Sequence, residues 1–499
     1  MNYLPHFSHL YTREQAYALD AAAIKSGISA SELMNRAAEA AAELIIEQFG
    51  PDQLVTIYTG SGNNAGDGFM LAALLKEQGS PVKIISVVPP AQLKGLAVDT
   101  HAYARAMGVE ITAFEEMPTS GILVDALLGI GGQGPLRAEI AAAVEQINAA
   151  ELPVVALDVP TGIDATTGAV ASVAIKATIT LSFLGLKSGL VTGRAPALVG
   201  KLLVDSLDVN AEVLTNSAHF GCVVNLAALL DTLPLRAKDS HKGNFGRVLV
   251  IGGERGFGGA ALLAAEAAAR VGAGTVSIAT RPEHVAAILA RRPEIMATGV
   301  VSGQELEPWL ERPTHLILGP GLGQTPWSEQ MLQQAINTDK PLVIDADALN
   351  ILAEGRVVKN PNGQGRWLLT PHPAEAARLL GITTQEVQAD RYTAARMIAE
   401  RYHAAVILKG AGSIVVVDEA SSVVIEGNAG MATGGMGDVL SGILGGLWAQ
   451  GLPLSVVVPL GASLHAAAAD LAAEEWGQRS LLAADIIPYV CELLASAEA

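Results

Sequence analysis

The sequence predicts an α/β protein with two domains, and three observations carry this prediction. The chain has 499 residues, which is more than one domain of ordinary size holds. Half of the residues are hydrophobic and only 16% are charged, so the chain can bury large cores. Short runs rich in Val, Ile and Leu alternate with helix-length segments, as in parallel sheets whose strands are buried on both faces. We therefore expect a doubly wound parallel sheet followed by a second α/β domain.

The first domain begins with two predicted helices. Thr12 and Gln15 form a capping-box pattern ahead of the first, and the second, 31–50, ends at a glycine. Six strands are predicted in alternation with helices, at 54–60, 82–88, 121–129, 153–160, 177–183 and 200–207. The polar stretch 208–221 contains the domain boundary, so the predicted domains are residues 1–215 and 216–499.

The second domain repeats the α/β rhythm without any short-period repeat. Its predicted strands are 247–253, 274–280, 315–321, 341–347, 366–372 and 405–410. The segment 359–366 is predicted to be an exposed turn, and after Gly430 the pattern is almost wholly helical.

Composition excludes several classes of protein. The net charge is −18 and no run of five basic residues occurs, so we expect no nucleic-acid binding. The N-terminal residues lack a basic region followed by an apolar core, so we expect no signal peptide. The best membrane candidate, 171–186, is shorter than the roughly 20 residues of a span, and we expect a buried strand there and no membrane segment. Cys222 and Cys491 have no metal-ligand spacing, which indicates a reducing, cytoplasmic location.

The segment 60–68, GSGNNAGDG, follows a predicted strand and opens a helix. It matches a variant of the dinucleotide-binding fingerprint, although a tight turn alone would also explain the glycines. The adjacent amides of Asn63 and Asn64 offer more polar contacts than a turn needs. Asp67 is either a ligand contact or a charge that favours the helix dipole.

Two more strand ends carry carboxylates and glycines. Asp125 lies inside a predicted strand before a glycine loop that ends at Pro135, and Asp158 ends a strand just before Thr161. A buried carboxylate is costly unless it is paired, although any single aspartate here could simply stabilise its loop. Loops at the carboxyl ends of parallel strands line the crevice where open α/β sheets bind ligands. Together the three loops predict a site.

These three segments resemble the NAD(P)H-hydrate epimerase family, over about residues 10–210. The resemblance implies a Rossmann-like fold, interconversion of the R and S epimers of hydrated NADH and NADPH, and a bound potassium ion. It implies that potassium is held by Asn64, Asp125 and Thr161 and that Asp158 is the catalytic acid or base and contacts the substrate. The other implied substrate contacts are Asn63, Asn64, Ala65, Gly66, Asp67, Gly129, Ile130, Gly131, Gly132, Gln133, Gly134 and Pro135.

Two further positions bear on this resemblance. Ala65 stands where that family more often has glycine, which narrows the loop. Lys187 stands where similar proteins carry a basic residue near the site, and an ordinary surface lysine is the alternative.

The second half has its own strand-end motifs. Gly258, Gly259 and Ala260 begin a helix whose small residues permit close packing on a sheet or a ligand, and the glycines of 318–323 let backbone approach a ligand. Asp345 and Asp347 follow a strand and could hold magnesium around phosphates, or one of them could cap a helix that begins at Ala348.

Two further positions invite both functional and structural explanations. His372 stands between two prolines, either as a rigidly placed ligand contact or as the start of a helix at Ala374. Lys409 precedes a glycine turn, a combination that suits a nucleotide phosphate or ribose, although a lysine at a strand end often points to water.

The segment 430–442, GMATGGMGDVLSG, is the richest in glycine. Gly434, Gly435 and Gly437 can present backbone N–H groups to an anion at the start of a helix. Asp438 in the first turn could be an ordinary N-cap. With the glycines before it and strand-end motifs around it, a base beside an anion hole is the better interpretation.

This half resembles the ribokinase-like superfamily, and more closely the ADP-dependent NAD(P)H-hydrate dehydratase family, from about residue 225 onward. The resemblance implies that Asp438 is catalytic and activates the hydroxyl of the hydrate, and that ADP binds with magnesium. The implied nucleotide contacts are Lys409, Gly410, Ala411, Gly412, Ser413 and Gly437. The implied hydrate contacts are Ala260, Gly323, His372 and Asp438. Met436 stands where a small hydroxyl residue is common.

Together the two halves resemble the bifunctional NAD(P)H-hydrate repair enzymes. The resemblance implies that the S hydrate is dehydrated at the expense of ADP, giving AMP and phosphate; ADP rather than ATP rests on the resemblance alone. We expect hydrated NADH and NADPH and ADP or AMP as ligands, no membrane partner, and a homo-oligomer. The alternative is a ribokinase-like small-molecule kinase with a stable phosphorylated product, fused to a non-catalytic Rossmann-like module that binds a ligand or protein.

Overall fold

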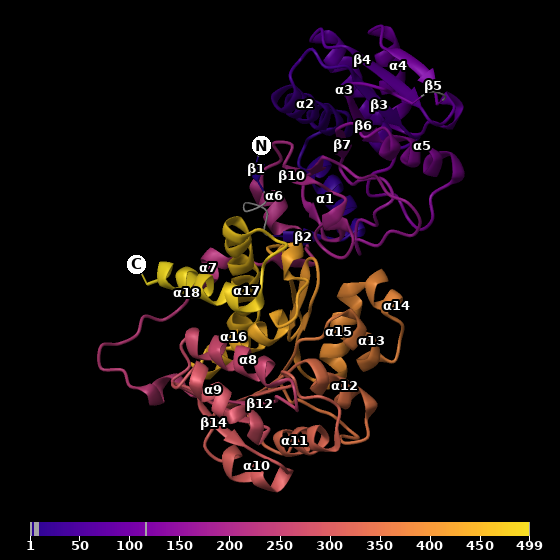
Figure 1. The fold of residues 1–499 in the computed structure, drawn as a ribbon. Coiled ribbons are helices and arrows are strands. Elements are labelled where there is room, and N and C mark those ends of the chain that lie inside the picture. Colours follow the sequence, from indigo (N-terminus) through magenta and orange to yellow (C-terminus); the bar gives the residue numbers. More distant parts are fainter. Residues whose placement is uncertain (1, 4–8, 115–116, 499) are drawn as a thin grey trace. The chain divides into compact units, whose positions relative to one another are not determined.

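The chain divides into two units, residues 1–223 and 224–499, called unit 1 and unit 2 below. The computed structural model describes residues 2–3, 9–114 and 117–498 (Figure 1). The units divide later than the boundary expected between residues 215 and 216. The reason is β11 (Gly221–Val223), which pairs with β2 (His9–Tyr11) and so remains part of unit 1.

Unit 1 contains the expected doubly wound sheet, with strand order β1-β10-β8-β7-β6-β3-β4-β5. All pairs are parallel except the one between β1 and β10. The strands are β1 (Asn2–Tyr3), β3 (Val55–Thr59), β4 (Val82–Ser86), β5 (Glu110–Ala113), β6 (Ile122–Ala126), β7 (Val154–Leu157), β8 (Ile179–Phe183) and β10 (Lys201–Asp205). The six predicted strands are confirmed, including buried β8 within 171–186. Edge strand β5 was not predicted because its short sequence, EITA, is mostly solvent-facing.

The helices of unit 1 cover both faces of this sheet. They are α1 (Arg13–Lys25), α2 (Ala30–Phe49), α3 (Asn63–Glu77), α4 (Leu96–Ala106), α5 (Ala138–Ala149) and α6 (Ala211–Asn216). The predicted capping box is confirmed, because the side chains of Thr12 and Gln15 each accept a hydrogen bond from the other residue's backbone N–H. Strand β2 also pairs with β11 and with β9 (Leu186–Lys187). The chain order changes direction between β3 and β6, which places the ligand crevice at their carboxyl ends.

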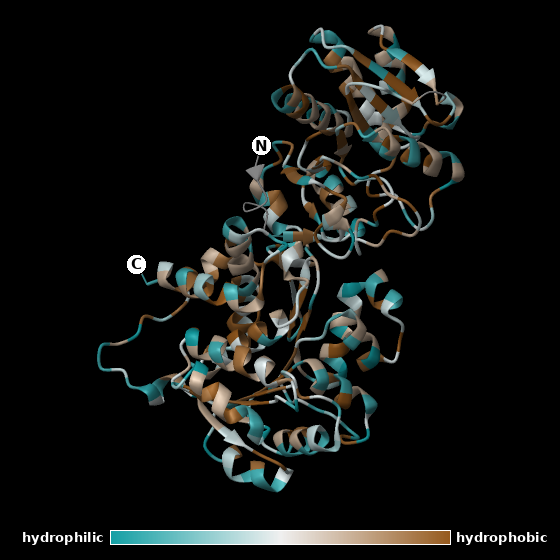
Figure 2. Ribbon diagram, viewed as in Figure 1, coloured by the Kyte–Doolittle hydropathy of each residue, from teal (hydrophilic) through white to brown (hydrophobic). Residues whose placement is uncertain are grey.

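Unit 2 is built on a sheet with the order β14-β13-β12-β15-β16-β17-β18-β19-β20. Its strands are β12 (Arg247–Ile251), β13 (Thr275–Thr280), β14 (Met296–Gly299), β15 (His315–Leu318), β16 (Leu342–Ile344), β17 (Trp367–Leu369), β18 (Ala405–Leu408), β19 (Ser413–Val417) and β20 (Ala420–Val424). Pairing is parallel from β14 to β18 and antiparallel beyond. The six predicted strands are confirmed, whereas β14, β19 and β20 were not predicted. In Figure 2 the central strands are mostly brown, consistent with burial on both faces.

Helices flank this sheet, and the region after Gly430 is mainly helical, as predicted. They are α7 (Leu226–Leu230), α8 (Gly258–Arg270), α9 (Val285–Arg291), α10 (Gly303–Leu310), α11 (Pro326–Ile336), α12 (Ala346–Glu354), α13 (Pro373–Leu380), α14 (Thr384–Ala389), α15 (Arg391–Tyr402), α16 (Met436–Ala449), α17 (Leu454–Trp476) and α18 (Ile486–Ser496). Within the described part of the chain, α17 is the one helix long and apolar enough to cross a membrane, but 67% of its apolar window is buried in the structure. It packs as a core helix.

Helices α8 and α16 approach each other through glycine. A Cβ built on Gly442 of α16 would lie 2.2 Å from the carbonyl oxygen of Ala264 in α8. One built on Gly446 would lie 2.6 Å from the carbonyl oxygen of Ala268. Backbone therefore contacts backbone along this pair, and the contact fixes where the first turn of α16 lies.

We expect Gly442→Ala to destabilise unit 2 by about 1–3 kcal/mol, because the added methyl group forces the two helices apart. Gly259→Ala in α8 is the matched control, since a Cβ at that position meets no atom within 4 Å. That variant should be neutral or more stable by up to about 1 kcal/mol. Denaturant unfolding of both variants checks this, and equal stabilities would contradict the close helix contact.

Candidate active sites

A pocket of about 580 Å³ lies at the carboxyl ends of the central strands of unit 1. The predicted residues that line it are Asn63, Asn64, Asp67, Gly129, Ile130, Gly131, Gly132 and Asp158. Ala65 and Gly66 are instead buried within α3, and a Cβ on Gly66 would meet Met34. Gln133, Gly134 and Pro135 are exposed beyond the pocket lining. The three predicted loops thus converge, but only part of each faces the pocket.

Asp158 and Lys187 form a buried ion pair in this pocket. Lys187 is 3% exposed, so the surface-lysine alternative is wrong. Its ammonium group contacts Asp158 Oδ1, Ser182 Oγ at 3.1 Å and the carbonyl oxygen of Phe183 at 2.7 Å. The second oxygen, Asp158 Oδ2, faces the glycine loop, 3.3 Å from a Cβ built on Gly129.

The backbone of Asp158 has an unusual conformation. Its φ angle is 65°, in the left-handed region that few side chains other than Asn and Asp occupy without strain. Its N–H donates to the carbonyl oxygen of Leu181 at 2.7 Å, which ties the turn to β8. The turn therefore holds the carboxylate at a fixed position at the end of β7.

The three predicted potassium ligands, Asp125, Thr161 and Asn64, are all buried. Asp125 is fully buried and accepts hydrogen bonds from the backbone N–H and hydroxyl of Thr161, at 2.7 and 2.8 Å. Burial raises the pKa of Asp125 to about 6, against the lowering effect of the Thr161 hydrogen bonds. Both polar atoms of the Asn64 side chain are buried without a hydrogen-bond partner in the structure. An all-oxygen donor set with an unsatisfied amide fits a hard cation such as potassium.

Helix α1 supplies a wall of the pocket that the sequence motifs did not reveal. Tyr17 and Asp20 line the pocket. Arg13 donates to the carbonyl oxygen of Ile130 at 2.8 Å and pairs with Asp164 at 2.8 Å, which fixes the helix to two of the loops. Positions 13, 17 and 20 share one face of a helix, and this spacing is the signal that could have identified them.

Two carboxylic acids of this pocket have raised pKa values. Burial raises the pKa of Asp20 to about 6, while Lys187 lowers it and Asp158 raises it. Burial, followed by the charges of Asp158 and Asp20, raises the pKa of Asp67 well above its ordinary value. Asp67 lies beyond the first turn of α3, so the helix-dipole explanation is not favoured.

In unit 2 the centre of the predicted site is a buried carboxylate, Asp345, which is 1% exposed. Its Oδ1 accepts hydrogen bonds from Lys409 Nζ and Thr370 Oγ1, both at 2.8 Å. Its Oδ2 accepts one from Ser441 Oγ of α16 at 2.8 Å. Asp345 thus joins the ends of β17 and β18 to the first turns of α16.

Asp438 is the third residue of α16. The N-cap position belongs to Gly435, whose φ angle is 94°, so the interpretation of Asp438 as an N-cap is wrong. Burial and the charge of Asp345 raise the pKa of Asp438 to about 7, while Lys409 lowers it. A Cβ on Gly437 would lie 3.2 Å from Lys409 Nζ, so the glycine backbone passes directly beside the Asp345–Lys409 pair.

Asp347 holds a neighbouring glycine loop. Its Oδ2 accepts from the N–H of Gly323 at 2.9 Å and its Oδ1 from Gln324 Nε2 at 3.0 Å. Helix α12 begins at Ala346 and not at Ala348, and Asp345, at its N-cap position, forms no side-chain cap. Ala260 lies near this loop, 3.0 Å from a Cβ built on Gly321.

His372 caps α13, which begins at Pro373 rather than at Ala374. Its Nδ1 accepts hydrogen bonds from the N–H groups of Ala374 and Glu375, at 3.1 and 3.3 Å, which bears out the structural explanation. The side chain is 48% exposed, so the ring remains accessible to a ligand. Burial raises the pKa of Glu375 to about 7, with Lys409 lowering it and Asp345 raising it.

The turn from Lys409 to Ser413 rests on a buried arginine that the sequence motifs did not reveal. Arg391 is 1% exposed and donates to the carbonyl oxygens of Leu408 and Lys409, each at 3.2 Å. Gly410 has a φ angle of 139°, and a Cβ there would lie 3.0 Å from the guanidinium group. The positive charge of Arg391 therefore lies directly beneath the glycine turn.

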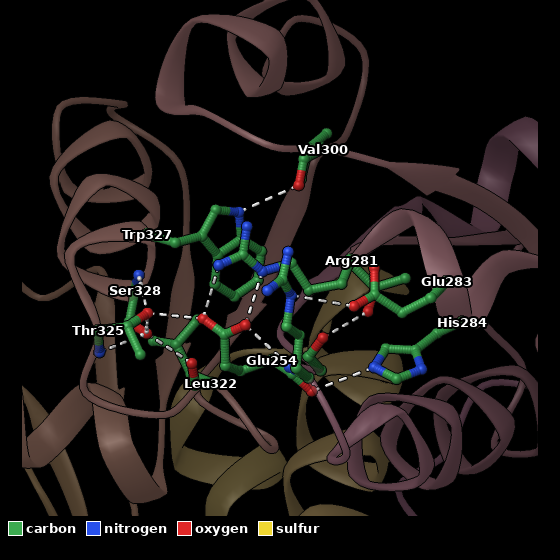
Figure 3. Close-up of polar contacts among 12 residues, drawn as sticks. Glu254, Arg281, Glu283, His284, Val300, Leu322, Thr325, Trp327 and Ser328 are labelled. Atoms are coloured by element: carbon green, nitrogen blue, oxygen red, sulfur yellow. Dashed lines mark hydrogen bonds and ion pairs between the residues drawn. The ribbon is translucent and has the colours of Figure 1, made fainter.

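A second ion pair fixes the loop after β12. The Glu254 carboxylate accepts two hydrogen bonds from Arg281, at 2.7 and 2.9 Å, and one from Thr325 Oγ1 at 2.6 Å (Figure 3). The guanidinium carbon lies 4.5 Å from the centre of the Trp327 ring. Burial raises the pKa of Glu254, but the hydrogen bonds from Arg281 and Thr325 outweigh it and lower the pKa to about 2.

Comparison with known proteins finds relatives along nearly the whole chain. The family model described as NAD(P)H-hydrate dehydratase matches residues 248–491, and the one described as YjeF-related protein N-terminus matches residues 30–189. The bifunctional NAD(P)H-hydrate repair enzyme of Coxiella burnetii is 44% identical over 96% of this chain and 98% of its own. That of Escherichia coli K12 is 38% identical over 92% and 88%.

Solved structures include a relative of unit 2. A ribokinase-like superfamily protein from Enterococcus faecalis V583 is 27% identical, with a TM-score of 0.51, and covers 55% of this chain and 95% of its own. The ribokinase-like fold expected for the second domain is thereby confirmed.

We expect Glu254→Gln to lower the stability of unit 2 at pH 7 by about 1–3 kcal/mol, because Arg281 loses its charged partner. The pKa of Glu254 is lower in the folded state than its ordinary value of 4.5. The wild-type advantage is therefore complete above pH 4.5 and declines as the pH falls toward about 2.

Denaturant unfolding at several pH values measures this difference. The matched control is Glu283→Gln, whose partner Arg255 is 77% exposed, so its loss should change stability little. A wild-type advantage that stays constant down to pH 3 would contradict the assigned pKa.

Proposed function

The chain belongs to the family of bifunctional NAD(P)H-hydrate repair enzymes, and on this basis we propose that it carries out both reactions of the name. Unit 1 interconverts the R and S epimers of hydrated NADH and NADPH, and unit 2 dehydrates the S epimer with ADP. The observation that carries the proposal is the place of Asp438, a half-buried carboxylate in the first turn of α16, directly after Gly437, whose backbone lies beside Lys409. This geometry combines a base with an anion site.

The residues of unit 2 suit a phosphoryl transfer to the hydroxyl of the hydrate. Asp438 takes the hydroxyl proton, and the oxygen forms a bond to the terminal phosphorus of ADP as the bond to AMP breaks. The carbon–oxygen bond then breaks and its electron pair leaves with the phosphate. Loss of a proton from the adjacent ring carbon restores the double bond of the nicotinamide ring. Lys409 and the N–H groups around Gly437 stabilise the transferring charge.

Each predicted contact of unit 2 has a role in this proposal. The turn of Lys409, Gly410, Ala411, Gly412 and Ser413 holds the AMP portion, with Gly437. Ala260, Gly323 and His372 contact the hydrate. Within the described residues no cluster of three His, Cys, Asp or Glu side chains could hold a metal, and Asp345 already accepts three hydrogen bonds from protein side chains. Magnesium would therefore enter with the nucleotide and neutralise its phosphates.

In unit 1 we assign substrate binding to the pocket-lining residues of the three loops. Asp158 Oδ2 is the atom that exchanges a proton with the substrate, because Oδ1 is engaged by Lys187 and by the N–H of Phe183. Asn64, Asp125 and Thr161 would hold potassium, whose charge would compensate the buried Asp125 carboxylate and fix the loop after β6. A cytoplasmic location is supported by Cys222 and Cys491, which are both free thiols. A homo-oligomer remains an expectation.

We expect Asp438→Asn to reduce dehydration of the S hydrate by about 10²–10⁴-fold, because the general base is lost. For the wild type, kcat/KM should fall as the pH drops below about 7, since Asp438 must be ionised. The recovery of dihydronicotinamide absorbance with ADP measures both effects.

Asp339→Asn is the control for this variant, because Asp339 is 91% exposed at the side chain and lies outside the site. A wild-type protein that consumed ADP and accumulated a phosphorylated hydrate without regaining absorbance would be a kinase, and the dehydratase assignment would fail.

We expect potassium to raise the melting temperature of unit 1 relative to choline at equal ionic strength. Linkage gives a stabilisation of about 2.7 kcal/mol at a cation concentration 100 times the Kd. Thr161→Val should abolish most of this shift, whereas Thr112→Val, on exposed edge strand β5, should retain it. An equal potassium shift in both variants would remove Thr161 from the cation site.

A further inference from the structure

Helix α1 is part of the epimerase pocket but lies outside residues 30–189, which the family model matches. Its residues Ala16, Tyr17, Leu19, Asp20 and Ile24 line the pocket. The hydroxyl of Tyr17 lies 3.2 Å from a Cβ built on Gly131, and Arg13 holds the helix to the same glycine loop. The wall formed by α1 is thus fixed against the loop that receives the substrate.

Asp20 is a carboxylate without a partner in this pocket. Within the described part of the chain it forms no hydrogen bond or ion pair, although it lines the same cavity as Asp158. The nearby cation, Lys187, already has three acceptors for its three N–H groups, namely Asp158, Ser182 and Phe183. Asp20 therefore has no structural pairing that would explain a carboxylate at this position.

We propose that Asp20 is the second proton-transfer group of the epimerisation and acts on the substrate together with Asp158. This inference rests on the proposed function of unit 1. The carbon that bears the hydroxyl group is inverted when its carbon–oxygen bond breaks on one face and water adds to the other face. Two proton-transfer groups on separate elements, α1 and the end of β7, can serve these two steps within one pocket.

The reaction balances with water as the only other reactant. In the hydrate, the carbon that bears the hydroxyl group is bonded to the ring nitrogen. Asp20 donates a proton to the hydroxyl oxygen, the carbon–oxygen bond breaks, the nitrogen lone pair forms a carbon–nitrogen double bond, and water leaves. A water molecule then adds to the opposite face, the double-bond electrons return to nitrogen, and Asp158 accepts the released proton. The reverse conversion uses the two aspartates in exchanged roles.

The acidity of the group is consistent with this task. A pKa of about 6 for Asp20 lets it both donate and accept protons near neutral pH. Burial and the charges of Asp158 and Asp20 also raise the pKa of Asp67, which lines the same pocket. Asp67 is therefore the rival that the experiment has to separate from Asp20.

The experiment follows conversion of purified R-hydrated NADH to the S epimer without ADP, in ¹⁸O-labelled water, with the full-length protein. We expect Asp20→Asn to lower the enzymatic kcat at least about 100-fold with little change in KM. Glu14→Gln is the matched control, because Glu14 lies on the same helix but is exposed and outside the pocket lining. Wild-type inversion should introduce one solvent oxygen per conversion above the enzyme-free rate.

Each outcome gives a decision. The melting transition of unit 1 should be unchanged in Asp20→Asn, which shows that this unit is folded, and the dehydration of the S hydrate by unit 2 should also be unchanged. The assignment of Asp20 is overturned if Asp20→Asn epimerises the hydrate at the wild-type rate, whether or not Asp67→Asn loses epimerase activity. It is also overturned if the wild-type protein inverts the carbon without ¹⁸O uptake. In both cases a loss of epimerase activity in Asp158→Asn still supports the proposed function of unit 1. If the wild-type protein does not interconvert the epimers, both the assignment of Asp20 and the proposed function of unit 1 are overturned.

Discussion

The cost of burying a carboxylate at the end of a parallel strand shapes both units. An unpaired buried charge is strongly unfavourable, so each such group must be matched by a cation or by several hydrogen-bond donors. Lys187 matches Asp158, Lys409 matches Asp345, and Arg281 matches Glu254. Each cation comes from a distant part of the sequence, so these pairs also fix the loops that form the sites.

Two carboxylates to which chemistry is assigned lack such a match. Asp438 and Asp20 are each half-buried, and burial raises the pKa of each toward neutrality. An unmatched carboxylate can change its charge during a reaction, whereas Asp158 pairs with Lys187 through Oδ1 and leaves Oδ2 for the substrate. Asp125 is an intermediate case, because it receives hydrogen bonds from Thr161 but no cation from the described residues.

The fold could be predicted because buried parallel strands are continuous apolar runs, and all twelve predicted strands exist. Edge strand β5 lacks that apolar signal. The hairpin of β19 and β20 begins at the end of the Lys409–Ser413 turn, whose glycines indicated a ligand contact. The loops of the sites could be found because several strand ends that carry glycine and aspartate meet at one edge of a parallel sheet. The ion pair of Lys187 with Asp158 could not be predicted, since it depends on tertiary packing. The side-chain cap that His372 forms could not be predicted either, because histidine is not among the preferred N-cap residues.

The left-handed turn at Asp158 narrows the choice of residue there in two independent ways. With a φ angle of 65°, the backbone favours glycine, asparagine or aspartate. Glycine has no side chain to reach Lys187, and asparagine, which has nearly the same shape as aspartate, lacks the negative charge that pairs with the ammonium group. Conformation and charge, acting on the same position, thus both favour aspartate.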